Sequence, residues 1–130
     1  MACLETTFLI DLLRGKNEAQ ELKNSFEMTE RSLAVTAPTV MELWSGALLD
    51  NAPPAECEQI NNLLNSLRIL PLTEQSAKLA AEMEVALIRK GLQVQPVDLM
   101  IAAIARINGE KLVTRDAHFA RIEGLKVLKY

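Results

Sequence analysis

The stretch QPVDLMIAAIAR, residues 95–106, determines how the rest of the chain is read. It predicts a helix that is apolar nearly all round and ends at an Asn-Gly pair, and such a helix is normally buried. Its only acid, Asp98, falls in the first turn, where the helix dipole and the free backbone N–H groups stabilise a carboxylate. The next apolar run, residues 111–114, predicts a short strand that leads to a second acid, Asp116. Together these two segments indicate a carboxylate cluster.

The composition is that of a soluble globular protein, and we expect one domain spanning residues 1–130. Hydrophobic residues make up 49% of the chain and aromatic residues only 4%, so the core should be aliphatic. The longest uncharged segment, residues 32–41, falls well short of the roughly 20 apolar residues of a membrane span. The first residues lack the pattern of a signal peptide. We therefore expect a cytoplasmic protein with no membrane span.

Charge and cysteine content exclude few functions. Cys3 and Cys57 lack metal-ligand spacing, and we expect both to be reduced thiols. The net charge of −3 argues at first against a nucleic-acid partner. If four acids are set aside for one metal site, however, the rest of the molecule carries +1, so the overall sign decides little.

Short apolar strands alternate with helices along the chain, which predicts an α/β fold. We expect a three-layer α/β/α sandwich with a mostly parallel central sheet. The strands are expected at residues 1–4, 32–36, 68–70, 111–114 and 125–128. Helices are expected at residues 6–13 (capped by Thr6 or Thr7), 17–28, 39–49, 56–67, 73–90 and from 97, with a short turn at 117–122. The connection 91–95 is too short to return along the preceding helix, since it spans only about 17 Å, so that helix should lie obliquely.

Four acids fall at the carboxyl edge of this predicted sheet, where parallel sheets bind ligands. Glu5 ends the first strand, Glu42 lies in the first turn of the helix after the second strand, and Asp98 and Asp116 complete the set. Each has a local alternative. Glu42 fits a capping box with Thr39, Asp98 and Asp116 could be N-caps, and Glu5 could reach solvent.

Taken together, the local alternatives explain the four acids less well than a metal does. Unit charges about 5 Å apart repel by roughly 3 kcal/mol at an effective dielectric near 20. Proteins gather carboxylates at one point mainly when a cation offsets that repulsion. Oxygen ligands without His or Cys pairs suit Mg²⁺ or Mn²⁺, which can activate water and bind phosphate oxygens.

Four segments of the chain resemble the signatures of PIN-domain proteins, and more narrowly those of the VapC toxins of bacterial and archaeal toxin–antitoxin pairs. The resemblance covers the whole chain in order and length. The segments are LETTFLIDLLRG at 4–15, ELWSGA at 42–47, DLMIAA at 98–103 and TRDAHF at 114–119.

The resemblance implies a Mg²⁺- or Mn²⁺-dependent endoribonuclease. It further implies a homodimer that is held inactive by a cognate VapB-type antitoxin, whose C-terminal segment covers the active site. Carried over by position, the catalytic and metal-binding residues would be Glu5, Glu42, Asp98 and Asp116, and the supporting hydroxyls Thr6 and Thr114.

One departure from the family pattern concerns the first acid, which is usually Asp and here is Glu5. The extra methylene lengthens the side chain by roughly 1.5 Å, which could alter metal preference or weaken activity. A second reading is therefore a PIN-like module with weakened catalysis that mainly binds antitoxin or RNA. A phosphoacceptor receiver domain is disfavoured, because no strand end offers the required Asp and Lys.

Several other polar residues flank the acids. Arg14, Lys16 and Arg115 could contact RNA phosphates or could be solvated surface charges. Asp11 is expected to pair with Arg14 or Arg115 in a structural role, and His118 is expected to be structural because no second ligand lies nearby in the sequence.

Overall fold

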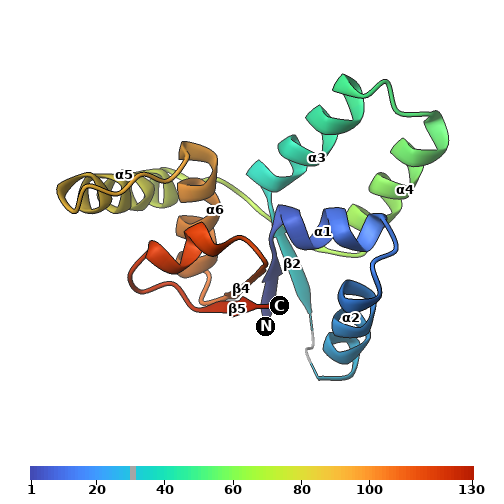
Figure 1. The fold of residues 1–130 in the computed structure, drawn as a ribbon, viewed down its shortest axis with the longest axis horizontal. Helices are drawn as coiled ribbons and strands as arrows, with labels where there is room; N and C mark the ends of the chain where they lie inside the picture. The colour runs from blue at the N-terminus through green and yellow to red at the C-terminus, as the bar shows by residue number, and fades with distance from the viewer. Residues whose placement is uncertain (30–31) are drawn as a thin grey trace.

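A parallel sheet of five short strands runs through the middle of the molecule (Figure 1). The computed structural model describes residues 1–29 and 32–130. The strand order is β3-β2-β1-β4-β5, and every neighbouring pair is parallel. The strands are β1 (Ala2–Leu4), β2 (Leu33–Thr36), β3 (Arg68–Leu70), β4 (Lys111–Thr114) and β5 (Val127–Lys129). The predicted mostly parallel sheet is therefore confirmed.

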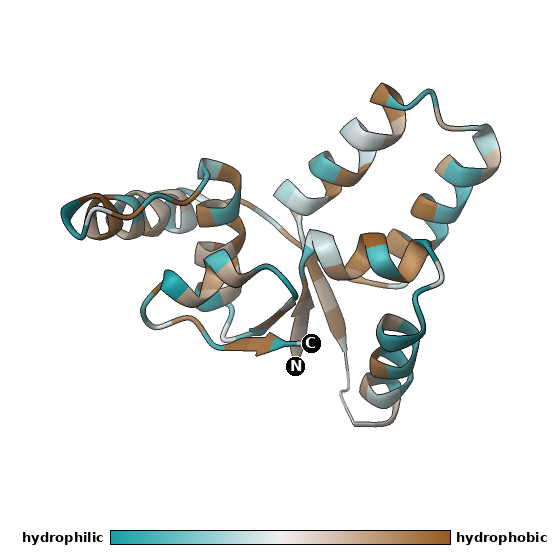
Figure 2. Ribbon diagram, viewed as in Figure 1, coloured by the Kyte–Doolittle hydropathy of each residue, from teal (hydrophilic) through white to brown (hydrophobic). Residues whose placement is uncertain are grey.

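Helices cover both faces of the sheet and complete the three predicted layers. They are α1 (Thr6–Leu13), α2 (Asn17–Thr29), α3 (Ala37–Leu49), α4 (Pro54–Asn65), α5 (Glu74–Arg89) and α6 (Pro96–Ile107), with a 3₁₀ helix η1 (Ala117–Arg121). Strand side chains alternate between the two faces. In β1, for example, Cys3 packs in the core with α5 and α6, whereas Ala2 and Leu4 pack in the core with α1 to α4. Figure 2 shows hydrophobic residues along the central strands and alternating colours on α2 and α4, as expected of helices with one buried face.

Helix α6 is the buried helix that the sequence predicts. Leu99 and residues 101–105 are buried, and the last five have no exposed surface. Helix α5 packs against α6 and extends sideways from it in Figure 1, which confirms its oblique course. Thr73 caps α5, as predicted, in a capping box with Ser76.

The cap of α1 and the starts of α3 and α4 differ from the predicted ones, and α4 begins at Pro54 rather than residue 56. Glu5, rather than Thr6 or Thr7, is the N-cap of α1, because its carboxylate accepts a hydrogen bond from the Thr7 N–H at 3.1 Å. Helix α3 begins at Ala37 instead of residue 39. Its cap is Thr36, and a proline in the first turn is tolerated because no backbone N–H is needed there.

The earlier start of α3 overturns one local explanation of Glu42. Thr39 lies inside the helix and donates its backbone N–H to the Thr36 hydroxyl at 3.3 Å, so Thr39 and Glu42 do not form a capping box. Glu42 consequently lies in the second turn of α3 rather than the first.

The described residues contain neither a membrane-spanning helix nor a disulfide. In residues 1–29 and 32–130, no helix is both long and apolar enough to cross a membrane. Both cysteines, Cys3 and Cys57, are free thiols.

An ion pair links β3 to Glu110, the residue just before β4, at the amino edge of the sheet. Arg68, the first residue of β3, donates from Nη2 to Oε1 of Glu110 at 2.7 Å and from Nε to Ser32 Oγ at 2.9 Å. The Glu110 side chain has no exposed surface, whereas that of Arg68 is 45% exposed. Removing the arginine would therefore leave a buried carboxylate without its cation.

We expect Arg68→Ala to lower the free energy of unfolding by about 2 kcal/mol, less than the loss for a fully buried pair because Arg68 is half exposed. Urea unfolding measures this change. Lys78→Ala is the control, because Lys78 pairs only loosely with Glu74 at 3.7 Å on the surface of α5. If Arg68→Ala lost no more free energy of unfolding than Lys78→Ala, a stabilising role of the Arg68–Glu110 pair would be contradicted.

Candidate active site

The fold brings the four predicted acids to the carboxyl edge of the sheet from four different segments. Glu5 follows β1, Glu42 lies on α3, Asp98 is the third residue of α6, and Asp116 follows β4 by two residues. Burial raises the pKa of Asp98 most, and the charges of Glu42, Glu5 and Asp116 raise it further. The four carboxylates therefore form one electrostatic cluster, as the sequence predicts.

Glu5 is held inside this cluster by three hydrogen bonds. Its carboxylate accepts from the Thr7 N–H at 3.1 Å, from the Thr7 hydroxyl at 2.6 Å and from the Thr114 hydroxyl. The side chain is nearly fully buried, so the local alternative in which Glu5 reaches solvent is wrong. Burial raises the pKa of Glu5, and the hydrogen bonds oppose that shift. Glu5 thus serves as the cap of α1 and as a member of the acidic cluster at once.

Glu42 is oriented by the residue that follows Glu5. The Thr6 hydroxyl donates to Oε1 of Glu42 at 2.6 Å and lies 3.1 Å from the Thr39 hydroxyl, which in turn lies 3.2 Å from that of Thr36. Thr6 and Thr114 therefore each contact one acid, in the positions that the sequence gives to supporting hydroxyls.

Asp98 lies in the first turn of α6, whose N-cap is Gln95, so the local alternative that Asp98 is an N-cap is wrong. Burial raises its pKa first, and the neighbouring charges of Glu42, Glu5 and Asp116 add to the shift, so that its pKa is about 6. Its place in the first turn of α6 favours the ionised form, but burial and repulsion outweigh that effect. A bound cation would favour the ionised form of Asp98.

Asp116 is the N-cap of η1, so this local alternative is confirmed, although Asp116 also belongs to the cluster. Its Oδ1 accepts the His118 N–H at 2.9 Å and lies 2.7 Å from His118 Nδ1. Partial burial favours protonation of Asp116, but these hydrogen bonds and the nearby positive charge keep its pKa below the ordinary value. His118 thus has the structural role that was expected.

Two contacts of the cluster escape sequence reasoning. Thr7 binds Glu5 through both its hydroxyl and its N–H, and His118 orients Asp116. Both residues lie two positions after their acid, the spacing at which a side chain caps a turn. That spacing is the signal from which these contacts could have been found.

The four carboxylates offer the oxygen ligands that suit Mg²⁺ or Mn²⁺. Within residues 1–29 and 32–130, no three Asp, Glu, His or Cys side chains converge into a ready-made cage. Mg²⁺ is usually bound through one or two carboxylates and keeps several waters, so such a cage is not required. Burial and then the charges of Glu42, Glu5 and Asp116 raise the pKa of Asp98, and a cation beside it would oppose both effects.

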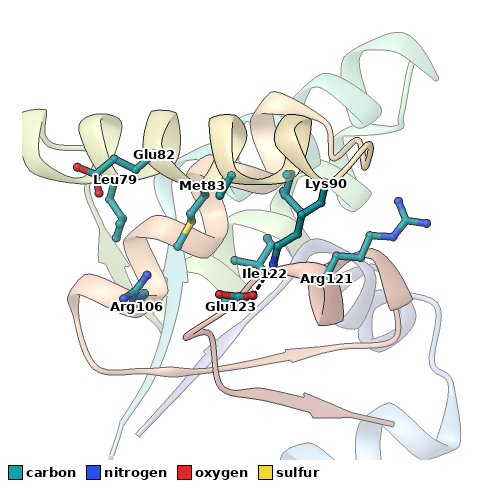
Figure 3. Close-up of a pocket in the computed structure, with 10 residues that line it drawn as sticks. Leu79, Glu82, Met83, Lys90, Arg106, Arg121, Ile122 and Glu123 are labelled. Carbon is teal, nitrogen blue, oxygen red and sulfur yellow. Dashed lines mark hydrogen bonds and ion pairs between the residues drawn. The ribbon is translucent and has the colours of Figure 1, made fainter.

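A hollow of about 520 Å³ opens beside Asp98 and His118, between the end of α5 and the start of α6. A smaller hollow of about 160 Å³, lined by Met83, Arg106 and Ile122 among others, lies between α5, α6 and the chain after η1 (Figure 3). The ion pair of Lys90 and Glu123 crosses it, and none of the four acids lines it. The acidic cluster with its larger neighbouring hollow is therefore the candidate site.

Comparisons with known proteins agree with this geometry. The sequence model of the PIN domain matches residues 2–125. The chain is 29% identical to the tRNA(fMet)-specific endonuclease VapC of Salmonella typhimurium over 86% of each chain, and 32% identical to ribonuclease VapC11 of Mycobacterium tuberculosis over 100% of this chain and 99% of the relative. Its structure is similar to that in the DNA-bound VapBC complex of Salmonella typhimurium, with 28% identity, a TM-score of 0.88 and coverage of 99% and 98%. The chain therefore belongs to the PIN-domain family, within the group of VapC ribonucleases.

Proposed function

We propose that this chain is a Mg²⁺- or Mn²⁺-dependent endoribonuclease, the toxin of a VapBC-type pair, and that a cognate VapB-type antitoxin neutralises it. The observation that carries the proposal is the placement of Glu5, Glu42, Asp98 and Asp116 at one edge of the sheet, where burial and the charges of the other three acids raise the pKa of Asp98. Membership of the VapC group supports RNA as the substrate and VapB as the partner. The homodimer that the resemblance implies stays a prediction.

In this proposal, Asp98 in the first turn of α6 and Asp116 after β4 would hold the cation together with Glu5 and Glu42. A bound Mg²⁺ or Mn²⁺ would lower the pKa of a coordinated water and stabilise negative charge on the scissile phosphate. Thr6 holds Glu42 and Thr114 holds Glu5, so two of the acids are oriented before substrate arrives.

The binding module with weakened catalysis remains the second candidate, because the position of Glu5 supports it. Both carboxylate oxygens of Glu5 already accept hydrogen bonds from Thr7 or Thr114. A cation at Glu5 must share those oxygens or displace a hydroxyl. Cleavage activity decides between the two candidates.

The test is cleavage of a panel of structured RNAs by purified, antitoxin-free protein in Mg²⁺, in Mn²⁺ and in EDTA. We expect cutting with either metal and none in EDTA. Folded protein that binds Mn²⁺ but does not cut would favour the binding module, and Glu5→Asp would then be the next variant. Cutting that is equal in EDTA would contradict metal dependence.

A further inference from the structure

The acidic cluster creates a problem for the substrate that we propose. RNA phosphates are repelled by the same carboxylates that would hold the metal, by roughly 3 kcal/mol per pair at about 5 Å and an effective dielectric near 20. The chain as a whole carries a net charge of −3 and offers no general attraction. An RNA strand that crosses this edge therefore needs local cations beside the cluster.

Such cations line a separate hollow of about 500 Å³ at the end of α1. Its cations are Arg14, Lys16 and Arg115, and its acids are Asp11 and Glu18. Asp11 and Arg115 offset each other's charge. The two cations Arg14 and Lys16 then face one acid, Glu18, so the hollow has a net positive charge. A volume of this size lies within the range of about 300–1,000 Å³ that is usual for ligand sites.

Arg115 is fixed in this hollow by a buried carboxylate. Its Nε and Nη2 donate to the two oxygens of Asp11 at 2.7 and 3.3 Å, and the hydroxyl of Tyr130 donates to Asp11 Oδ2 at 2.7 Å. The Asp11 side chain is 9% exposed, whereas that of Arg115 is 50% exposed. An arginine has five N–H donors, so Arg115 keeps donors for a second partner and loses little conformational entropy on binding it.

A tight turn places Lys16 on the same hollow. The Lys16 N–H donates to the Asp11 carbonyl at 3.0 Å, which closes the turn at the end of α1, and Gly15 adopts the left-handed conformation (φ 72°) that the turn needs. The charge of Lys16 reaches Asp11 and contributes to lowering its pKa.

The hollow is linked to the acidic cluster through the backbone after β4. Arg115 lies between Thr114, which contacts Glu5, and Asp116, whose pKa its charge helps to lower. A phosphate seated at Arg115 would therefore lie close to the cluster without entering it.

We propose that this hollow is a phosphate-binding subsite for the RNA strand, in which Arg14, Lys16 and Arg115 contact phosphates outside the scissile one. The inference rests on the proposed ribonuclease function. Backbone contacts of this kind hold the strand in place without reading its sequence.

The test measures RNA binding without cleavage. A short fluorescein-labelled oligouridylate is titrated with protein in EDTA at several salt concentrations, and fluorescence anisotropy gives Kd. Lys16→Gln and Arg14→Gln should each weaken binding about fivefold near 0.1 M salt and lower the slope of log K against log salt by about 0.7, as for one lost phosphate contact on single strands. The matched controls Lys78→Gln and Arg89→Gln on α5 should leave Kd and the slope unchanged.

Arg115 needs a paired variant, because Arg115→Gln alone would leave Asp11 without its cation and could unfold the chain. The double variant Asp11→Asn with Arg115→Gln keeps the net charge and the shape of the pair. We expect it to weaken RNA binding about fivefold, the cost of one phosphate contact. An effect of net charge alone would leave its Kd unchanged.

The outcomes separate this inference from the proposed function. Binding that depends on the three cations without metal-dependent cleavage would support the subsite and contradict the nuclease. Metal-dependent cleavage with hollow variants that bind RNA like the controls would contradict the subsite alone. No RNA binding by the wild-type chain even at low salt would overturn the subsite.

Discussion

Asp98→Asn is expected to lower RNA cleavage by about a hundred- to a thousandfold, the range seen when one preorganised electrostatic contact to a transition state is lost. Asp98 lies in the first turn of helix α6, and the charges of the other three acids act on its carboxylate. Asparagine keeps the shape of the side chain and removes its charge, so the cation site would lose a negative ligand while the fold is kept. The measurement is the initial rate of RNA cleavage in saturating Mg²⁺.

Asp50→Asn is the matched control for this substitution, because Asp50 is an exposed carboxylate at the C-terminal end of α3, away from the four acids. Its rate should equal that of the wild type. Wild-type rates in Asp98→Asn would place the chemistry elsewhere in the chain.

The second large effect is the response of stability to pH and to Mg²⁺. The pKa of Asp98 in the folded chain is about 6, above its ordinary value of 3.8, so the folded chain binds more protons than the unfolded chain between these values. Stability of the metal-free protein should therefore fall as pH rises from about 4 to 6. Because Asp98 is only half buried, we expect a loss of about 1 kcal/mol, which corresponds to a drop in Tm of roughly 4 °C.

Mg²⁺ at pH 7 should restore this loss by offsetting the repulsion, and Asp98→Asn should remove the part of the pH response due to Asp98 and most of the Mg²⁺ response. The raised pKa of Glu5 acts in the same direction as that of Asp98, so the pH response that remains in Asp98→Asn is the part due to Glu5. The lowered pKa of Asp11 acts in the opposite sense, but at more acidic pH, where its contribution to stability is lost on protonation. Thermal unfolding of both proteins across this range measures the effect, and parallel pH curves for the two would contradict it.

The sequence predicts the sheet well because its strands are bounded by unambiguous signals. The strands at 68–70 and 111–114 match the structure at both ends. The first stops at a proline, and the second lies between a glycine turn and an acid. The last strand lies two residues later at its start than predicted, at Val127–Lys129, since the residues after Gly124 carry no such signal.

Capping was harder to predict, because several residues compete for each cap. Near the start of α1, Glu5, Thr6 and Thr7 all carry side-chain oxygens, and local preference favours threonine over glutamate. The structure uses Glu5 as the cap because Thr6 is engaged by Glu42 and Thr7 donates its hydroxyl to Glu5. The Thr6–Glu42 contact joins distant parts of the chain, so no local rule reveals it, whereas the Thr7–Glu5 contact is local.

Contacts between distant parts of the chain also limited the prediction of the site. The four acids could be placed together from topology, because each follows a strand or begins a helix at one edge of the sheet. Which of two arginines would pair with Asp11 could not be decided. The structure selects Arg115, since β4 lies beside β1 and brings that residue over α1.

Mn²⁺ binding, followed by electron paramagnetic resonance, tests most directly whether the acidic cluster holds a cation. Wild-type protein, Asp98→Asn and Asp50→Asn are titrated with Mn²⁺, and RNA cleavage is measured in the same samples. We predict that the wild type and Asp50→Asn bind Mn²⁺, that Mg²⁺ displaces it, and that Asp98→Asn loses both binding and cleavage. Unchanged Mn²⁺ binding by Asp98→Asn, or cleavage that continues in EDTA, would contradict a metal site at these four carboxylates.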